Sequence, residues 1–304
     1  MNQHNFSQPE ERFISILSDY GFKVTFGNEH DTLFLRTALQ MLINSEIPIV
    51  DISFDDSTFE GLARESRGGI YDIICTDAAN NTYIIEMQVA EYKHLIQRLK
   101  FYALHKFNTM VKRGKYKFDN LTKIYCIGFS AENIYKDTQY YRRGLLTDSN
   151  GLIMDPLLEY ITIELSKFRL SIDEIQTGLD KLLYLMKHLP QLKEAISFPN
   201  WLNEDWIQAA IQELDKRNLP PEKLLRYEMT LAQNAAIVYA FDEKIEEAKV
   251  EARIEAREET KTKAIKRLLQ RGKQSPEEIA EDNEVTLAFV LAIKEILEKE
   301  EKEK

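Results

Sequence analysis

Apolar side chains recur at helical spacing in some segments of the chain and form short, bounded runs in others. From Asp31 to Asn44 the spacing of Leu35, Leu39 and Leu42 is helical. Pro48 follows shortly afterwards, which suits the end of a helix. The pattern therefore predicts an amphipathic helix over this segment.

Short apolar runs bounded by turn-forming residues predict strands. The predicted strands are residues 49–54, 69–77, 82–88, 123–130 and 160–165. Only the sequence Ala-Ala-Asn-Asn separates the second run from the third, and these residues tolerate turn geometry. The second and third strands are therefore expected to form one hairpin.

A longer helix is predicted between the hairpin and the fourth strand. No Pro or Gly interrupts the chain from Glu91 to about Arg113, and Leu95 and Leu99 belong to an apolar stripe at helical spacing. Gly114 suits the position just beyond the end of this helix. The order of helix, strand, hairpin, long helix and strand predicts an α/β fold with a small mixed sheet flanked by helices.

Strand patterns end near Ser171, and this change divides the chain into three predicted regions. We expect an α/β domain over residues 1–170 and a helical domain over residues 171–240. A charged long helix and a small helical tail are expected over residues 241–304. The second half of the chain is thus predicted to be entirely helical.

The charged helix is predicted over residues 242–271, after a loop near Pro220–Pro221. Its apolar face is thin, so it suits a solvated connector at least as well as a coiled coil that would let the C-terminal helices self-associate. Gly272 can cap this helix. Ser275 then begins a Ser-Pro-Glu-Glu capping box, which predicts the start of a small helical pair.

The composition favours a soluble, cytoplasmic protein with a real core, since 44% of the residues are hydrophobic. No apolar run approaches the ~18–20 residues that a membrane span needs. The N-terminal sequence also lacks the basic-then-apolar order of a secretory signal. Cys75 and Cys126 lie within apolar, strand-like runs, so we expect buried free thiols rather than a zinc site or a disulfide.

The net charge of −10 argues against a nucleic-acid partner until its distribution is considered. Between Lys93 and Arg143 the sequence has twelve Lys or Arg residues against three acids. We call residues 93–143 the basic block. Such a block within an acidic chain is typical of a phosphate-binding surface, and it is equally typical of a solvated helix face followed by a lysine-rich turn.

Three polar side chains of the hairpin are the candidates for chemistry. Glu86 and Gln88 are two residues apart on one predicted strand, so they share a face, and Asp72 on the other strand can lie across from them. Carboxylates placed so close repel one another unless they share a cation. Mg²⁺ often binds one or two carboxylates together with water and phosphate, so we expect both acids to face one pocket. The same spacing also occurs among ordinary surface residues of hairpins.

Four segments, taken in order, make the sequence resemble a known family. They are DYGFKVTFG (19–27), GIYDIICTDAANNTYIIEMQ (69–88), KRGKYKFDNLTKIYCIGF (112–129) and RLLQRGKQSPEEIA (267–280). Together with a helix that holds Arg98 and Tyr102, they resemble the PD-(D/E)XK nuclease family transposases, also called Rpn-type recombination-promoting nucleases.

The resemblance implies a restriction-endonuclease-like αβββαβ core followed by an all-helical C-terminal region. It also implies that Asp72 and Glu86 bind Mg²⁺ or Mn²⁺, and that Gln88 takes the place of the Lys in the family motif. A Lys would bring a positive charge to the attacking water or the phosphate, whereas an amide can only orient by hydrogen bonding. The activity implied is that of a metal-dependent DNA endonuclease acting in recombination or transposition of mobile DNA. The alternative is a catalytically inactive module that binds nucleic acid or protein on the same fold.

Other residues are candidates for supporting roles. Arg98 or Lys23 could replace the missing cation, and each could equally be a surface side chain. Asp19 is either an auxiliary acid or a helix N-cap, and Tyr102 is a second auxiliary candidate. The predicted DNA-binding residues are Lys23, Arg98, Lys112, Arg113, Lys115 and Lys117.

Overall fold

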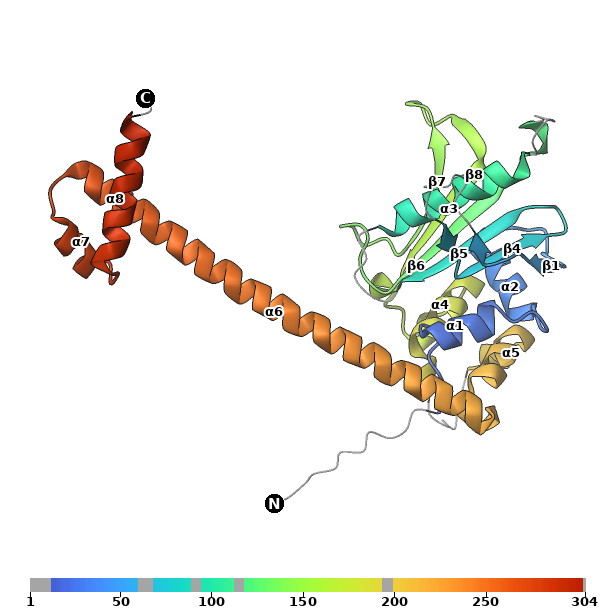
Figure 1. The fold of residues 1–304 in the computed structure, drawn as a ribbon. Helices are drawn as coiled ribbons and strands as arrows, with labels where there is room; N and C mark the ends of the chain where they lie inside the picture. The colour runs from blue at the N-terminus through green and yellow to red at the C-terminus, as the bar shows by residue number, and fades with distance from the viewer. Residues whose placement is uncertain (1–11, 60–67, 89–93, 112–117, 193–198, 303–304) are drawn as a thin grey trace, which may run out of the picture. The chain divides into compact units, whose positions relative to one another are not determined.

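The computed structural model of the chain describes residues 12–59, 68–88, 94–111, 118–192 and 199–302. The chain forms two compact units, residues 1–224 and residues 225–304, and each is described by itself. Both units are coloured by residue number in Figure 1.

A six-stranded mixed sheet forms the centre of the first unit, with strand order β1-β4-β5-β6-β8-β7. Its strands are β1 (Ile52–Phe54), β4 (Ile73–Asp77), β5 (Thr82–Gln88), β6 (Ile124–Ser130), β7 (Tyr141–Thr147) and β8 (Ile153–Glu164). β5, β6 and β8 are parallel to one another, while β1, β4 and β7 run antiparallel to their neighbours. The carboxyl ends of the three parallel strands therefore meet at one edge of the sheet.

One face of the sheet is covered by α3 (Leu95–Met110), as Figure 1 shows. Leu95 and Leu99 of this helix pack in one core cluster with Ile84 of β5 and Cys126 of β6. A methyl group on Gly128 of β6 would lie 2.9 Å from a carbon of Leu95, so the helix rests directly on the strand at this point.

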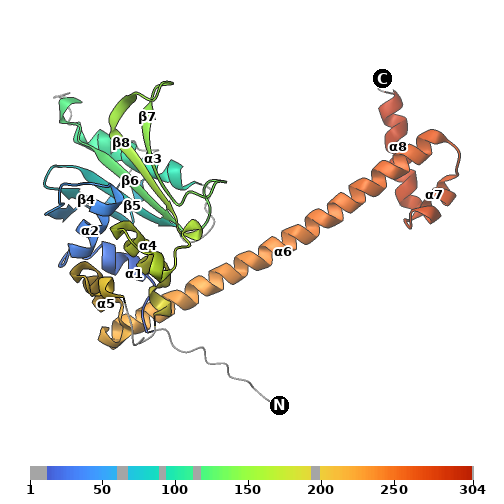
Figure 2. The ribbon, with the colours of Figure 1, turned by 180° about the vertical axis from the view of Figure 1, so that it is seen from behind.

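The opposite face is covered by α1 (Asp19–Phe26), α2 (Leu33–Leu42), α4 (Gly178–His188) and α5 (Asp205–Leu214), which Figure 2 shows from behind. Phe22 and Phe26 of α1 contact Phe129 of β6, with ring centroids 6.3 and 5.6 Å apart. Phe34 of α2 extends this aromatic core toward Trp206 of α5. All four helices bury apolar side chains that the sheet alone could not shield from water.

Short elements complete the first unit. A two-stranded hairpin pairs β2 (Thr58–Phe59) with β3 (Gly69–Ile70). The 3-10 helices are η1 (Phe118–Asn120), η2 (Leu165–Lys167), η3 (Ile172–Glu174), η4 (Leu189–Gln191), η5 (Asn200–Asn203) and η6 (Lys216–Asn218).

The α/β fold with a helical C-terminal region is confirmed, with differences in detail. β7 was not predicted, and the predicted strand over residues 69–77 is two strands, β3 and β4, interrupted at Tyr71 and Asp72. The hairpin β2–β3 lies between β1 and β4 in the chain, and β7 and β8 follow β6. The exact αβββαβ core therefore stays a prediction.

The second unit is helical. It contains the greater part of α6 (Pro221–Arg271), a helix of 51 residues, with α7 (Pro276–Asp282) and α8 (Leu287–Lys302). The predicted start of the charged helix at residue 242 is wrong, because Pro221 opens the helix instead of ending a loop. Ser275 accepts a hydrogen bond from the Glu278 N–H, which confirms the predicted capping box.

Three smaller expectations can be compared with these elements. Gly272 follows α6 with a φ of 57°, the left-handed conformation expected of a helix-ending glycine. Cys75 and Cys126 are free and buried, and burial raises the pKa of both thiols. Among the described residues, no helix combines the length and apolar character of a membrane span.

Candidate active site

Asp72 and Glu86 lie opposite each other where β4 and β5 separate. Ile73 of β4 pairs with Ile85 of β5, and the next step of this antiparallel register brings Asp72 beside Glu86. The Asp72 N–H donates to Oε1 of Glu86 at 3.0 Å, and the Met87 N–H donates to Oδ2 of Asp72 at 2.9 Å. Each carboxylate thus accepts a hydrogen bond from the main chain of the neighbouring strand.

Burial makes both carboxylates unusually basic. The Glu86 side chain is 0% exposed, and desolvation, followed by the charge of Asp72, raises the pKa of Glu86 to about 7. Desolvation likewise raises the pKa of Asp72, although the Met87 N–H, Arg98 and Lys23 act in the opposite direction. The pair therefore favours binding of a positive charge that would stabilise both ionised forms.

Arg98 supplies a positive charge to this pair from α3. Its Nη2 lies 2.5 Å from Oε2 of Glu86, and its Nη1 donates to Oε1 of Gln88 at 3.2 Å. Nη2 also donates to the Tyr102 hydroxyl at 3.3 Å, and that hydroxyl donates to the Ile70 carbonyl. The structure therefore brings together the predicted residues Asp72, Glu86, Gln88, Arg98 and Tyr102.

Asp19 and Lys23 approach the site from α1. They form an ion pair of 2.8 Å, and each side chain is more than half exposed. Ser18, not Asp19, caps the helix by accepting a hydrogen bond from the Gly21 N–H, so the N-cap interpretation of Asp19 is wrong. Ser18 occupies the N-cap position, and Asp19 lies in the first turn of α1.

A small cavity of about 110 Å³ lies between α1 and the separating strands. Asp19, Lys23 and Asp72 line it, whereas Glu86 does not. This cavity does not decide whether both acids face one pocket, which stays a prediction. Glu86 belongs to the α3 face of the sheet, and its ion pair with Arg98 keeps its carboxylate there.

A larger cavity of about 860 Å³ lies beside the N-terminal half of α3. Arg98 and Tyr102 belong to its wall, so it adjoins the Glu86 ion pair. Phe59 of β2 and Phe101 of α3 also line this cavity. Sequence reasoning missed it, because its walls come from a short hairpin and a helix face that no motif links.

The carboxyl edge of the sheet continues the site in register. Gln88 of β5 pairs with Ser130 of β6, which pairs with Glu164 of β8. Glu164 is buried and accepts hydrogen bonds from the N–H groups of Ile134 and Tyr135 while it pairs with Lys167 at 2.8 Å.

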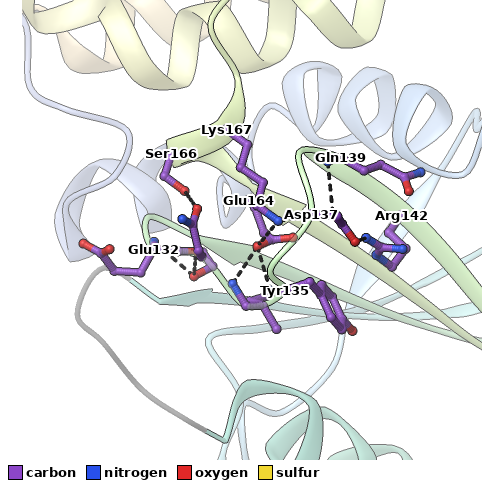
Figure 3. A network of polar contacts seen from close by, with 11 residues as sticks. Glu132, Tyr135, Asp137, Gln139, Arg142, Glu164, Ser166 and Lys167 are labelled. Carbon is purple, nitrogen blue, oxygen red and sulfur yellow. Dashed lines mark hydrogen bonds and ion pairs between the residues drawn. The ribbon is translucent and has the colours of Figure 1, made fainter.

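Figure 3 shows this polar network holding the loop after β6. Lys167 also contacts Asp137, which in turn pairs with Arg142. The sequence analysis did not select Glu164 or Lys167, whose only signal was an acid at the end of an apolar strand. The network fixes the main chain beside the end of β5.

Most described cations of the basic block are paired with acids, four of them with acids from outside the block. Lys93, Lys112, Arg113, Lys115 and Lys117 lie outside the described residues, which leaves seven of the twelve cations. Five of these seven form ion pairs, namely Arg98–Glu86, Lys106–Asp55, Lys123–Glu159, Arg142–Asp137 and Arg143–Glu159. Lys100 and Lys136 are exposed. The count of charges in the sequence therefore overstates the free positive charge of this surface.

The donors at the site suit a hard divalent cation better than a transition metal. Among the described residues, no group of three or more His, Cys, Asp or Glu side chains could hold a metal ion. Asp72 and Glu86 nevertheless supply two carboxylates, and Gln88 adds an amide oxygen nearby. Mg²⁺ commonly takes one or two carboxylates and completes its shell with water and phosphate, so this set fits it.

The comparisons with known proteins give the family of the chain. No curated protein and no solved structure gives a significant match. A family model described as PD-(D/E)XK nuclease family transposase matches residues 16–244, which is more than half of the chain. The match includes Asp72, Glu86, Gln88 and Arg98. The chain therefore belongs to the PD-(D/E)XK nuclease family transposases.

Proposed function

We propose that this protein is a metal-dependent DNA endonuclease that hydrolyses phosphodiester bonds during recombination or transposition of mobile DNA. Family membership supports nuclease activity, DNA as the substrate and the use of a divalent metal. The observation that carries the proposal is the pairing of Asp72 with Glu86, each bonded to the other's strand and both close to Arg98. Surface acids of an ordinary hairpin would be exposed, whereas Glu86 is completely buried.

Asp72 and Glu86 are the residues that would hold Mg²⁺ or Mn²⁺. The metal, when bound, polarises the scissile phosphate and lowers the pKa of the attacking water. The chain itself contributes two fixed carboxylates, since the hydrogen bonds from Asp72 N–H and Met87 N–H restrain both side chains. Fixed ligands avoid reorganisation during the reaction.

Arg98 takes over the positive charge that the family motif places at the position of Gln88. Its guanidinium contacts both Glu86 and Gln88, so the amide of Gln88 orients the cation instead of providing it. Although burial opposes its charge, Glu86 and Tyr102 raise the pKa of Arg98 above its usual value. Arg98 therefore stays protonated and can stabilise negative charge on the phosphate.

DNA reaches this site past the exposed side chain of Lys23. Lys23 is 57% exposed and lines the cavity that Asp72 borders, which suits contact with a backbone phosphate. Lys112, Arg113, Lys115 and Lys117 remain proposed contacts for more distant phosphates. Since most described cations of the basic block are paired with acids, Lys112, Arg113, Lys115 and Lys117 would supply much of the remaining attraction.

A binding module without catalysis is the second candidate. The ion pair between Arg98 and Glu86 favours it, because the buried carboxylate already has a charge partner. In this alternative, Gln88 marks the loss of the catalytic cation, and the same fold binds nucleic acid or protein.

A nicking assay on supercoiled plasmid tests the two candidates. We expect nicking with Mg²⁺ or Mn²⁺ and none after chelation with EDTA. The Glu86→Gln variant, which keeps the shape and removes the charge, is the matched control for contaminating nucleases. If the parent and Glu86→Gln nick equally, or if neither nicks DNA with either metal, the nuclease proposal fails.

A further inference from the structure

The larger cavity beside α3 has an aromatic wall. Phe59 and Phe101 line it with ring centroids 5.8 Å apart, and the Tyr102 ring lies 5.7 Å from Phe59 and 5.9 Å from Phe101. Phe101 is 43% exposed, so part of its ring is accessible to a ligand. Base–aromatic stacking uses such exposed ring faces and tolerates any base, because every base has a π-face.

Polar groups along the same cavity can bind the edge of a planar ligand. His94, Gln97, Arg98 and Phe101 occupy positions i, i+3, i+4 and i+7 of α3 and its N-cap, so they lie along one face of the helix. His94 and Gln97 are exposed and carry both donors and acceptors. The cavity thus combines a stacking surface with hydrogen-bonding groups of the kind that read a base edge.

Arg98 connects this cavity to the proposed catalytic pair. Its guanidinium contacts Glu86 at 2.5 Å, while its side chain forms part of the cavity wall. A nucleotide whose phosphate lies at Arg98 would have its sugar and base within reach of the cavity. The volume of about 860 Å³ falls in the range of small-molecule sites and can hold one nucleotide.

The backbone of Gly69 packs closely against two rings of the cavity wall. A methyl group at this position would lie 2.6 Å from a ring carbon of Phe59 and 3.0 Å from one of Tyr102. Glycine therefore lets β3 approach both rings without displacing them. Both rings are thereby held in place in the cavity wall.

We propose that this cavity binds one unpaired nucleobase of the DNA strand being cut, stacked on Phe101 and hydrogen-bonded by Gln97 or His94. The proposal rests on the nuclease function and specifies its substrate class as DNA that is single-stranded, or has an unpaired base, next to the cleaved bond. A base within an intact duplex is stacked on both sides and cannot enter such a cavity without unpairing.

Binding of labelled oligonucleotides to the full-length protein in EDTA tests the proposal without cleavage. The probes are a perfect duplex, a single strand and a duplex with one unpaired 2-aminopurine, all of one sequence. We expect the probes with an unpaired base to bind more tightly than the perfect duplex, and the 2-aminopurine fluorescence to be quenched on binding. Phe101→Ala should weaken binding of the unpaired probes about 5- to 150-fold, the size of one base–aromatic stack, and remove the quenching.

Two variants serve as controls. Phe118→Ala removes a phenylalanine that is 68% exposed and does not line the cavity, so its affinities should equal those of the parent. Phe101→Tyr keeps a stacking ring and should restore most of the affinity. Thermal unfolding of each variant shows whether a loss of binding comes from a loss of folding.

The outcomes separate this proposal from the nuclease proposal. If Phe101→Ala binds all three probes as the parent does, or weakens the perfect duplex as much as the others, the base-binding proposal is wrong even when the parent nicks plasmid. If the parent never nicks DNA but Phe101→Ala loses the unpaired probes selectively, the cavity binds a base and the nuclease proposal fails.

Discussion

The main-chain N–H of Asp72 donates a 3.0 Å hydrogen bond to the carboxylate of Glu86, across the point where two strands separate. The bond joins the two acids through the backbone of one and the side chain of the other. Changing the Asp72 side chain therefore leaves this bond in place, while changing Glu86 removes a charged acceptor. The two acids can be tested separately for this reason.

Asp72→Asn and Glu86→Gln should each reduce DNA cleavage by at least about 10³-fold, because neutral side chains bind a hard divalent cation poorly. DNA affinity in EDTA should stay within about twofold of the parent, since phosphate contacts come mainly from Lys and Arg. Plasmid nicking and fluorescence anisotropy measure the two quantities.

Asp55→Asn is the matched control for this pair. Asp55 also pairs with a cation of α3, Lys106, at 2.7 Å, but it lies away from Glu86 in the ion-pair network. Its cleavage rate should remain close to that of the parent. Equal losses in Asp55→Asn and Glu86→Gln would show that the effect comes from anchoring α3.

Arg98→Gln should lower cleavage by about 10²–10³-fold, the typical effect of removing one donor that stabilises a transition state. Gln88→Ala should be milder, because it removes a partner that orients Arg98 and no charge. Gln88→Lys alone should keep or raise activity.

The double variant Arg98→Gln with Gln88→Lys tests whether the two positions can exchange the cation. We expect it to recover at least about tenfold over Arg98→Gln, measured as single-turnover cleavage with Mg²⁺. If the double variant does not recover while Gln88→Lys alone stays active, Arg98 acts only by positioning Glu86.

Glu164→Gln should destabilise the first unit by about 1–3 kcal/mol, because a buried acceptor of charged hydrogen bonds loses its charge beside Lys167. Urea unfolding followed by tryptophan fluorescence measures the change. Glu132→Gln, at an exposed position in the same loop, should be neutral within about 0.5 kcal/mol. Equal stabilities of the two variants would contradict the anchoring role of Glu164.

Glu159 gives a prediction about pH. Although burial opposes its charge, hydrogen bonds from Arg143 and Lys123 lower the pKa of Glu159 in the folded protein. As the pH falls, Glu159 therefore takes up a proton in the unfolded state before it does so in the folded state. The contribution of ionised Glu159 to stability is full above about pH 4.5, the ordinary pKa of Glu, and disappears as the pH drops through its lowered pKa in the folded state.

Glu159→Gln should accordingly cost about 1–3 kcal/mol near pH 7 and much less near pH 3. Urea unfolding midpoints across this range provide the measurement. Glu246→Gln, which breaks an exposed ion pair with Lys249, should change little at either pH. A Glu159→Gln cost that is independent of pH would contradict the ionic role of Glu159.

Local sequence patterns predicted the sheet strands that are apolar and regular. β5 covers the predicted residues 82–88, and β6 begins one residue after the predicted start at Lys123. β7 was missed, because Arg142 and Arg143 interrupt its apolar pattern and most of the strand is exposed or half-buried. Such a strand is specified by its pairing with β8 rather than by an alternation of apolar and polar residues in its own sequence.

The acids of the site and Arg98 as a candidate cation could be predicted, but the ion pair between Arg98 and Glu86 could not. Asp72 and Glu86 follow from hairpin register, which is local. The Arg98–Glu86 ion pair depends on how α3 is rotated on the sheet, and this rotation is set by the packing of Leu95 and Leu99. Long-range partners of this kind carry no signature in the spacing of residues.

The basic block shows the same limit for charge. Lys123 and Arg143 were counted as positive surface, yet both pair with Glu159, and Lys106 pairs with Asp55. Counting charges in a window omits acids that the fold brings from outside it. The electrostatic potential at the surface depends on the folded chain, and the composition sets only the total charge.

Gly128, which lies outside the candidate site, supports the helix that carries Arg98. Leu95 and Leu99 rest on its bare backbone, at distances of 2.9 and 3.1 Å from where a methyl group would be. One added carbon would press against the ends of both leucine side chains, so either these side chains rotate or α3, with Arg98, shifts by a few tenths of an ångström. Because misplacement by about 1 Å can cost 10²-fold in rate, the proposed cleavage rate would be sensitive to a residue of the hydrophobic interior. Natural variation at such an interior position would thus lower the proposed nuclease activity while every residue of the candidate site stays unchanged.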